Sequence, residues 1–213
     1  MLLFTTCVDK NDFTIPSIDS VTLANNSISC LNEDFEKYEV NFNQFSNYIN
    51  HVSKGGKLWT VQRYISSSYI EASAYGSNRI NIHQFLIPID FSKADAISFK
   101  TKDGYNNGNP LKIYYTNSFQ ISDYRHQMYL PTKDTNKFTD ITNKFAISTG
   151  SIDGYAKKYI DSGVVNFSTL GASGTGFIVF EYDNTPVVDS EYVTTTIQID
   201  DIQIIDNENL SCK

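Results

Sequence analysis

The sequence is short of charge, cysteine and long apolar runs, and each shortage excludes a class of protein. Charged residues make up only 19% of the chain, and the formal net charge is −7. A nucleic-acid-binding surface needs an excess of Lys and Arg, so nucleic acid is not expected as a partner. No stretch approaches the roughly 20 apolar residues of a membrane-spanning helix. The three cysteines show no Cys-x-x-Cys spacing, which excludes a disulfide-dense scaffold and a cysteine-rich zinc site.

Aromatic side chains are plentiful instead, with 14 Tyr and 14 Phe among the 213 residues. They recur in short alternating segments bounded by Gly, Asn and Asp, a pattern typical of strands joined by turns. The predicted strands include 57–64, 69–75, 80–89, 96–102, 111–115, 159–167, 177–182 and 194–205. About ten strands with little helix predict an all-β protein, an antiparallel β-sandwich of jelly-roll type. We expect residues 1–20 to form an N-terminal tether and residues 21–213 to form one domain.

The clearest local pattern runs from Ala96 to Thr116. Apolar and polar residues alternate on both sides of Asp103–Asn109, a run of Asp, Gly and Asn broken by one Tyr. These residue types reverse the chain, so the stretch predicts a long antiparallel hairpin. Between residues 31 and 48, apolar residues recur three or four apart among several Asn residues. This spacing leaves open a short helix or an irregular loop.

No motif indicates catalysis, and we predict that the protein is not an enzyme. The histidines (His51, His83 and His126) are far apart in the sequence and show no metal-binding spacing. Gly171–Gly176 precedes an apolar strand rather than a helix, which excludes a phosphate-binding loop, and it does not have the spacing of a nucleophile elbow.

Aromatic residues are the candidates for ligand binding. Their rings can stack on sugars while Asn and Asp accept hydrogen bonds, which is the chemistry that glycan recognition needs. The alternative is that Tyr fills strands, with its hydroxyl at the rim. The predicted ligand-binding residues are Trp59, Tyr64, Tyr69, Tyr75, Tyr105 and Tyr124.

The N-terminus contains a possible lipid-anchor site. The apolar run Met1–Thr6 precedes Cys7 as the end of a bacterial lipoprotein signal precedes its acylated cysteine. The acidic, Pro-containing stretch Val8–Pro16 resembles the tether of Bacteroidetes surface lipoproteins. No basic segment and no full apolar segment precede Cys7, so a β-strand start with a buried Cys is the alternative.

Several short motifs follow one another in a familiar order. They are Asp34–Glu36, Trp59 after Gly55–Gly56, Ala72–Tyr75, Phe85–Ser92, Ile97–Gly108, Ile113–Thr116, Phe177–Tyr182 and Ile199–Ile202. Together they resemble the choice-of-anchor J and DUF5017-type domains of Bacteroidetes surface lipoproteins, over roughly residues 32–206. Those domains are similar to galactose-binding-like and MAM-like jelly rolls. The chain departs from the pattern in its contracted Phe85–Asp90 and in Asp201, where the family has Asn.

The resemblance implies a non-catalytic, lipid-anchored module on the outer membrane, exposed at the cell surface. Its partner would be a glycan or an outer-membrane nutrient uptake complex. A protein-interaction or adhesion module is the alternative, and a hydrolase is a weaker one.

In the architecture of these families the first and last strands lie close together, and Cys30 and Cys212 flank those strands. Cys30 and Cys212 would then be able to form a disulfide, the alternative being two free thiols. Carboxylates from both ends would likewise form a structural calcium site, the alternative being solvated surface groups. The predicted ligands are Glu33, Asp34, Glu36, Asp200 and Asp201.

Overall fold

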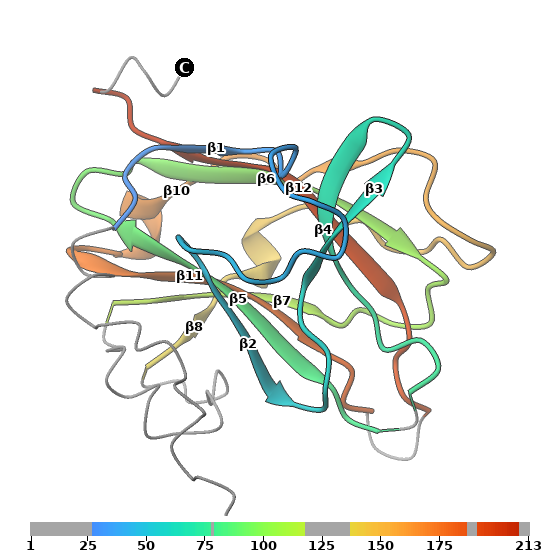
Figure 1. Cartoon of the computed structure of the whole chain (residues 1–213). Coiled ribbons are helices and arrows are strands. Elements are labelled where there is room, and N and C mark those ends of the chain that lie inside the picture. The colour runs from blue at the N-terminus through green and yellow to red at the C-terminus, as the bar shows by residue number, and fades with distance from the viewer. Residues whose placement is uncertain (1–26, 78, 118–136, 187–190, 209–213) are drawn as a thin grey trace, which may run out of the picture.

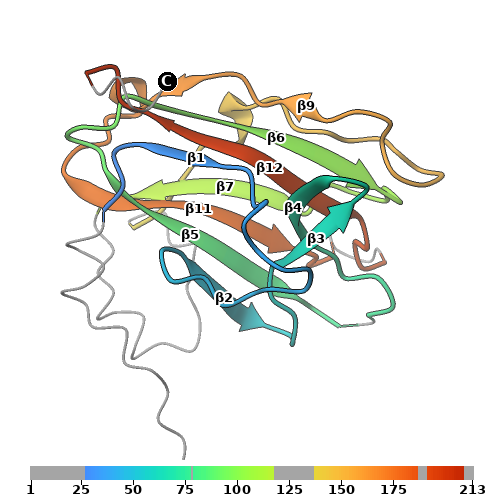
Figure 2. The ribbon, with the colours of Figure 1, turned by 45° about the horizontal axis from the view of Figure 1, so that its top comes forward.

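The protein is a sandwich of two antiparallel β-sheets (Figures 1 and 2), and its computed structural model describes residues 27–77, 79–117, 137–186 and 191–208. The predicted all-β class is confirmed, because seven strands form one sheet and five form the other. The helical residues of the described ranges are two short 3-10 turns, η1 (Thr142–Lys144) and η2 (Phe167–Leu170). Within these ranges no helix is long and apolar enough to cross a membrane.

The seven-stranded sheet is built around its last strand. It consists of β1 (Leu31–Glu33), β3 (Thr60–Tyr64), β4 (Ser67–Ala72), β6 (Ala96–Gly104), β9 (Ile160–Asp161), β10 (Val165–Asn166) and β12 (Thr196–Ile205). Strand β6 pairs along one side of β12, while β4 and β1 pair with successive halves of the other side. Strands β9 and β10 likewise pair with successive parts of the free side of β6. Strand β12 therefore contacts three strands and holds the sheet together.

The five-stranded sheet has the order β2-β5-β11-β7-β8. Its strands are β2 (Ile49–Lys54), β5 (Ile82–Asp90), β7 (Leu111–Thr116), β8 (Thr139–Asp140) and β11 (Thr175–Asp183). Figure 2 shows this layer packed under β6 and β12. The core between the layers is aliphatic and aromatic, and its fully buried members include Ile70, Phe85, Ile87, Ile89, Ile97, Phe99, Ile113, Ile178, Phe180, Ile199 and Ile202.

The predicted hairpin is wrong, although both of its strands exist. Strand β6 belongs to the seven-stranded sheet and β7 to the five-stranded sheet, so the turn between them crosses from one layer to the other. Alternation predicts a strand but does not identify the strand that pairs with it. The side chain of Asn107 accepts hydrogen bonds from the backbone N–H of Thr194 (2.8 Å) and Thr195 (3.2 Å), which ties this crossover to the start of β12.

Residues 34–48 form an irregular loop, which decides between the two alternatives for this segment. Its aromatic side chains pack against one another and against Phe85, so they close one edge of the sandwich. Trp59 is fully buried behind them, and its indole N–H donates to the backbone oxygen of His83 at 3.4 Å.

The two ends of the domain meet, as the family resemblance implied. Strand β1 pairs with β12 so that Leu31 lies opposite Ile204. Cys30, directly before β1, is disulfide-bonded, which excludes a free thiol at this position. The two other cysteines, Cys7 and Cys212, lie outside the described residues.

Glu33 ties β1 to the irregular loop. Its carboxylate is buried (1% exposed) and accepts hydrogen bonds from the Tyr48 hydroxyl (2.6 Å), the Lys37 ammonium (2.8 Å) and the Phe35 backbone N–H (3.1 Å). Burial, followed by the hydrogen bond to Glu33, raises the pKa of Tyr48, which keeps its hydroxyl a donor. The interactions of Glu33 therefore join three parts of the chain.

Replacing Glu33 should destabilise the domain because its donors would lose their acceptor inside the protein. We expect Glu33→Ala to lower the free energy of unfolding by about 2–4 kcal/mol. Glu33→Gln retains acceptor capacity and should cost less than Glu33→Ala. Urea unfolding measures both, with exposed Glu39→Ala as the matched control. Equal effects of Glu33→Ala and Glu39→Ala would contradict the role of Glu33.

Candidate functional site

The candidate site lies on the outer face of the seven-stranded sheet, the face turned away from the core. Along β6, the outward residues Ser98, Lys100 and Lys102 alternate with buried residues. Strand pairing then aligns Glu71 on β4, Gln198 on β12 and Lys102 on β6 as a polar row across the sheet.

Four tyrosines gather at this polar row. The ammonium of Lys102 lies 5.6 Å from the ring centroid of Tyr159 and 5.9 Å from those of Tyr64 and Tyr155. Tyr69 packs on Tyr159, with centroids 6.4 Å apart and planes tilted by 59°. We call Tyr64, Tyr69, Tyr155 and Tyr159 the tyrosine cluster. Its members come from β3, β4 and residues 154–159, so the cluster is a product of the fold.

The segment that carries Tyr155 and Tyr159 is attached to β6 through Asp103. The Asp103 carboxylate is fully buried and accepts from the Ser148 hydroxyl (2.6 Å), the Ser151 N–H (2.9 Å) and the Asn106 amide (2.9 Å). Its backbone oxygen accepts from the N–H of Ala156 at 2.8 Å. Burial disfavours the ionised carboxyl, but these donors outweigh it and hold the pKa of Asp103 below its usual value.

Gly104 allows the Tyr155 ring to lie directly against β6. The two residues form an antiparallel bridge, and a Cβ at position 104 would come within 2.5 Å of the Tyr155 ring. That distance is shorter than ordinary van der Waals contact, so a larger residue would displace the ring. The sequence Asp103-Gly104 thus combines an anchor for the segment with space for its first tyrosine.

A polar network lies beneath the tyrosines. The Tyr159 hydroxyl donates to the Gln198 side-chain oxygen (3.4 Å), and the Gln198 amide donates to the Glu71 carboxylate (2.9 Å). Nearby, the hydroxyl of Ser67 donates to the Asp200 carboxylate at 3.4 Å. Gln198 and Asp200 are 3% and 7% exposed although they face outward, because other side chains cover them.

Burial changes the acidity of this face. It raises the pKa of Tyr69 to about 12 and also raises the pKa of Tyr159, so both phenols stay protonated and can donate hydrogen bonds. Burial raises the pKa of Asp200 to about 6, against the opposing hydrogen bond from the Asp201 N–H. Burial also raises the pKa of Glu71 above its ordinary value. The site therefore has polar groups but reduced negative charge at mildly acidic pH.

The aromatic residues predicted to bind a ligand lie in different parts of the structure. Tyr64 and Tyr69 belong to the tyrosine cluster, and Tyr105 packs edge to face on Tyr155 with centroids 5.5 Å apart. Trp59 is 0% exposed, so its assignment to ligand binding is wrong: it is a core residue. The remaining two predicted residues are Tyr75, which is exposed in the turn after β4, and Tyr124, which lies outside the described residues.

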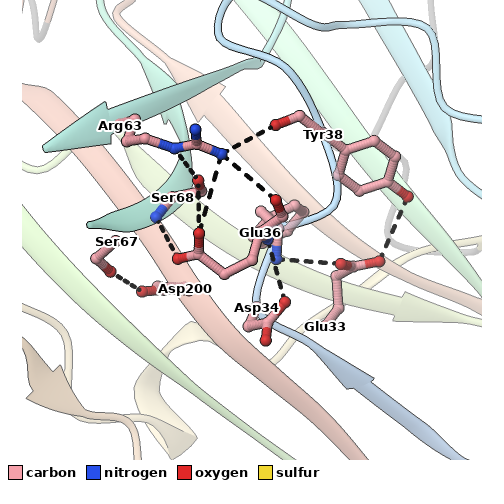
Figure 3. Close-up of polar contacts among 9 residues, drawn as sticks. Glu33, Asp34, Glu36, Tyr38, Arg63, Ser67, Ser68 and Asp200 are labelled. Atoms are coloured by element: carbon pink, nitrogen blue, oxygen red, sulfur yellow. Dashed lines mark hydrogen bonds and ion pairs between the residues drawn. The ribbon is translucent and has the colours of Figure 1, made fainter. Parts of the chain in front are cut away.

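The predicted calcium ligands do not assemble into one site. In the described part of the chain, no three His, Cys, Asp or Glu side chains group closely enough to hold a metal ion. Figure 3 shows three of the carboxylates turned to different protein partners, with Glu33 near Tyr38, Glu36 at Ser68 and Asp200 at Ser67.

The other two predicted ligands also have local partners. Asp34 accepts from the Glu36 N–H at 3.1 Å, and Asp201 pairs with Lys100 at 2.7 Å. Pairing of β1 with β12 brings the strands together, but their carboxylates serve separate hydrogen-bond networks. As folded, these five carboxylates do not group into one site, and a structural calcium ion stays a prediction.

Reasoning from sequence missed the residues that join the cluster across the sheet. Lys102, Tyr155, Tyr159, Glu71 and Gln198 lie on four separated segments and form no sequence motif. A useful signal was the outward position of Lys102 in the alternation of β6. The partners of Lys102 depend on strand order, which alternation does not reveal.

No protein-family model and no curated protein matches the chain. Among solved structures, the K1 cleaved adhesin domain of Lys-gingipain from Porphyromonas gingivalis W83 is 16% identical, covers 84% of this chain and 99% of its own, and has a TM-score of 0.46. The K3 cleaved adhesin domain of the same protein is 14% identical, covers 83% and 98%, and has a TM-score of 0.47. A carbohydrate-binding module specific for non-crystalline cellulose is 12% identical, covers 84% and 94%, and has a TM-score of 0.42. With TM-scores this low, the function has to be inferred from the side chains of the site.

Asp200→Asn should stabilise the protein at pH 7.5 and have little effect at pH 4. Because folding raises the Asp200 pKa from 3.8 to about 6, the folded state binds this proton more tightly than the unfolded chain. The resulting stabilisation is present below the unfolded pKa and is lost as the pH rises through about 6. An amide does not ionise, so the free energy of unfolding should rise by about 1–3 kcal/mol at pH 7.5.

Urea unfolding at both pH values measures this difference. Exposed Asp153→Asn is the matched control and should show no comparable pH-dependent gain. An Asp200→Asn variant that is equally stabilised at both pH values, or is not stabilised at pH 7.5, would refute the predicted cost of the buried carboxylate.

Proposed function

We propose that the protein is a non-catalytic glycan-binding module whose ligand binds over the tyrosine cluster. The observation that carries this proposal is the gathering of tyrosines around Lys102 on an outer sheet face. Rings that only filled the core would be buried, whereas Tyr64 is 66% exposed and Tyr155 is 45% exposed. Exposed aromatic rings beside hydrogen-bonding groups are typical of binding sites.

The chemistry of the cluster suits a sugar. Aromatic faces pack on the C–H surface of a pyranose ring, while protonated phenols and the Lys102 ammonium can bond its hydroxyl groups. The rings are held by contacts with one another and with Lys102, so binding would cost little side-chain entropy.

Binding without hydrolysis is the better assignment for the acids of this face. The Asp200 carboxylate is 7% exposed and accepts from the Asp201 N–H (2.7 Å), while Glu71 accepts from Gln198 (2.9 Å). Both groups therefore support neighbouring side chains. Release of reducing sugar from a polysaccharide by the purified protein would instead support the hydrolase alternative.

Removing an exposed ring from the cluster should weaken glycan binding. We expect Tyr64→Ala and Tyr155→Ala each to raise the Kd about tenfold, which corresponds to roughly 1.4 kcal/mol of lost interaction. Tyr75→Ala is the matched control, since Tyr75 is 74% exposed and lies in the turn after β4, outside the tyrosine cluster. Calorimetry with a glycan selected from an array measures all three.

Unchanged affinity in both cluster variants would exclude the tyrosine cluster as the site. Binding of a protein partner that sugars do not compete with, together with an empty glycan array, would favour the adhesion alternative.

We also propose that the module is a cell-surface lipoprotein of the outer membrane, attached through Cys7 and accessory to nutrient uptake, with Cys30 paired to Cys212. Pairing of β1 with β12 supports this disulfide. Cys30 is disulfide-bonded and directly precedes β1, and β1 lies beside β12, the strand that Cys212 follows in the sequence. This leaves Cys7 available for acylation. Peptide mass spectrometry of the native protein should find a lipidated Cys7 and a Cys30–Cys212 peptide. An unmodified Cys7 or a Cys7–Cys30 peptide would contradict the proposed anchor.

A further inference from the structure

A pocket lies on the same outer face as the tyrosine cluster, beside it along β6. It has a volume of about 330 Å³ and is lined by residues of β6 and β12 and by the loop between β9 and β10. This volume is at the lower end of the range for small-molecule sites, roughly 300–1,000 Å³. Its lining includes the side chains of Ser98, Lys100, Asp161, Val164, Asp201 and Gln203.

An irregularity in β12 shapes the boundary between the cluster and the pocket. The register with β6 shifts between Asp200 and Gln203, and Asp201 has a positive φ of 48°. A positive φ is uncommon for a residue other than Gly, and β-bulges often redirect side chains near functional sites. Here Asp200 bonds Ser67 on one side of the irregularity, while Asp201 bonds Lys100 at the pocket.

The pocket and the cluster lie along one line on β6. Lys102 contacts the tyrosines, and Lys100 and Ser98 line the pocket at the next two outward positions. Ser98 and Lys102 are four residue steps apart on an extended strand, a span of about 13 Å. A single sugar ring is shorter than this span, whereas a linear oligosaccharide can cover it.

The charges of the two areas disfavour an acidic ligand. Glu71 and Asp200 lie by the cluster, Asp161 and Asp201 line the pocket, and Lys100 and Lys102 are the two cations on this line. Lys100 is already paired with Asp201 at 2.7 Å. A uronate or sulfate group in the pocket would face the carboxylates of Asp161 and Asp201 while the Lys100 ammonium is already paired, and like charges repel.

The pocket offers the groups that a neutral sugar uses. Ser98 and Gln203 present a hydroxyl and an amide, joined by a weak hydrogen bond of 3.4 Å that a ligand hydroxyl can replace. The side chain of Val164 is exposed at the rim and offers an apolar surface to ring C–H groups. The pocket therefore combines polar and apolar contacts.

We propose that this pocket is a second subsite, and that the protein binds a neutral, linear glycan running along β6 from the tyrosine cluster to the pocket between β12 and the β9–β10 loop. This inference rests on the proposed glycan-binding function and adds the ligand's charge, minimum extent and direction. Short ligands bind at the cluster alone, and longer ones gain affinity by entering the pocket.

The test is calorimetry with purified oligosaccharides of two to six units. The probes are neutral glucans, mannans, galactans and xylans, with oligogalacturonates as the acidic set. For the wild type, affinity should rise about tenfold between the short and long members of one neutral series and be at least tenfold weaker for oligogalacturonates. Two variants test the pocket: Gln203→Ala, and Gln203→Ala combined with Asp161→Ala. In both, the gain in affinity from short to long oligosaccharides should shrink to less than threefold. Their affinity for the shortest oligosaccharide that binds should stay within twofold of the wild type.

Asn143→Ala is the matched control, since Asn143 is exposed on η1, outside both areas. If the rise with length persists in the pocket variants while Tyr64→Ala still weakens binding, the second subsite is wrong and the proposed function stands. Tighter binding of oligogalacturonates would overturn the neutral-ligand assignment. If no oligosaccharide binds the wild type, the proposed function itself fails.

Discussion

The buried carboxylate of Asp103 is the constraint on which the outer-face site depends. It accepts from Ser148, Ser151 and Asn106, and the backbone of the same residue binds Ala156. These bonds attach residues 148–156 to the end of β6, and β9 then pairs with β6 further along. Tyr155 lies within the first attachment, next to Ala156, and Tyr159 directly precedes the second. The buried residue Asp103 thus fixes the position of the segment that carries two of the surface tyrosines.

Most of the fold was predictable from the sequence, because alternation and turn residues report strands directly. The antiparallel sandwich and the pairing of the first and last described strands, β1 and β12, are confirmed. The pairing of β6 with β7 is wrong, since alternation describes the two faces of a strand and says nothing about its neighbour. Less of the site was predictable. Tyr64 and Tyr69 were expected from the abundance of tyrosine, but Trp59 is a core residue. Lys102 lies near three tyrosine rings only because of the strand order, which the sequence does not show.

The outer face differs from the core in its chemistry as much as in its exposure. The core between the layers is aliphatic and phenylalanine-rich, whereas the outer face of β4, β6 and β12 contains Glu71, Lys102, Gln198 and Asp200 beneath tyrosine rings. Keeping a row of polar groups nearly buried costs stability unless each finds a partner. Tyr159 bonds Gln198, Gln198 bonds Glu71, and Ser67 bonds Asp200, while Tyr64 and Tyr155 stay exposed. This combination favours ligand binding at a rigid surface.

We expect a neutral glycan to bind on the outer face of the seven-stranded sheet. An amide NMR titration with tetrasaccharides of glucose, mannose, galactose and xylose tests it most directly. A binding sugar should shift the amide signals of Tyr64, Lys102, Tyr155 and Gln198, followed by those of Lys100 and Gln203. The signals of the outward residues of β2 and β11 should stay unchanged. Shifts confined to the five-stranded sheet, or no shift with any of the four sugars at millimolar concentration, would contradict it.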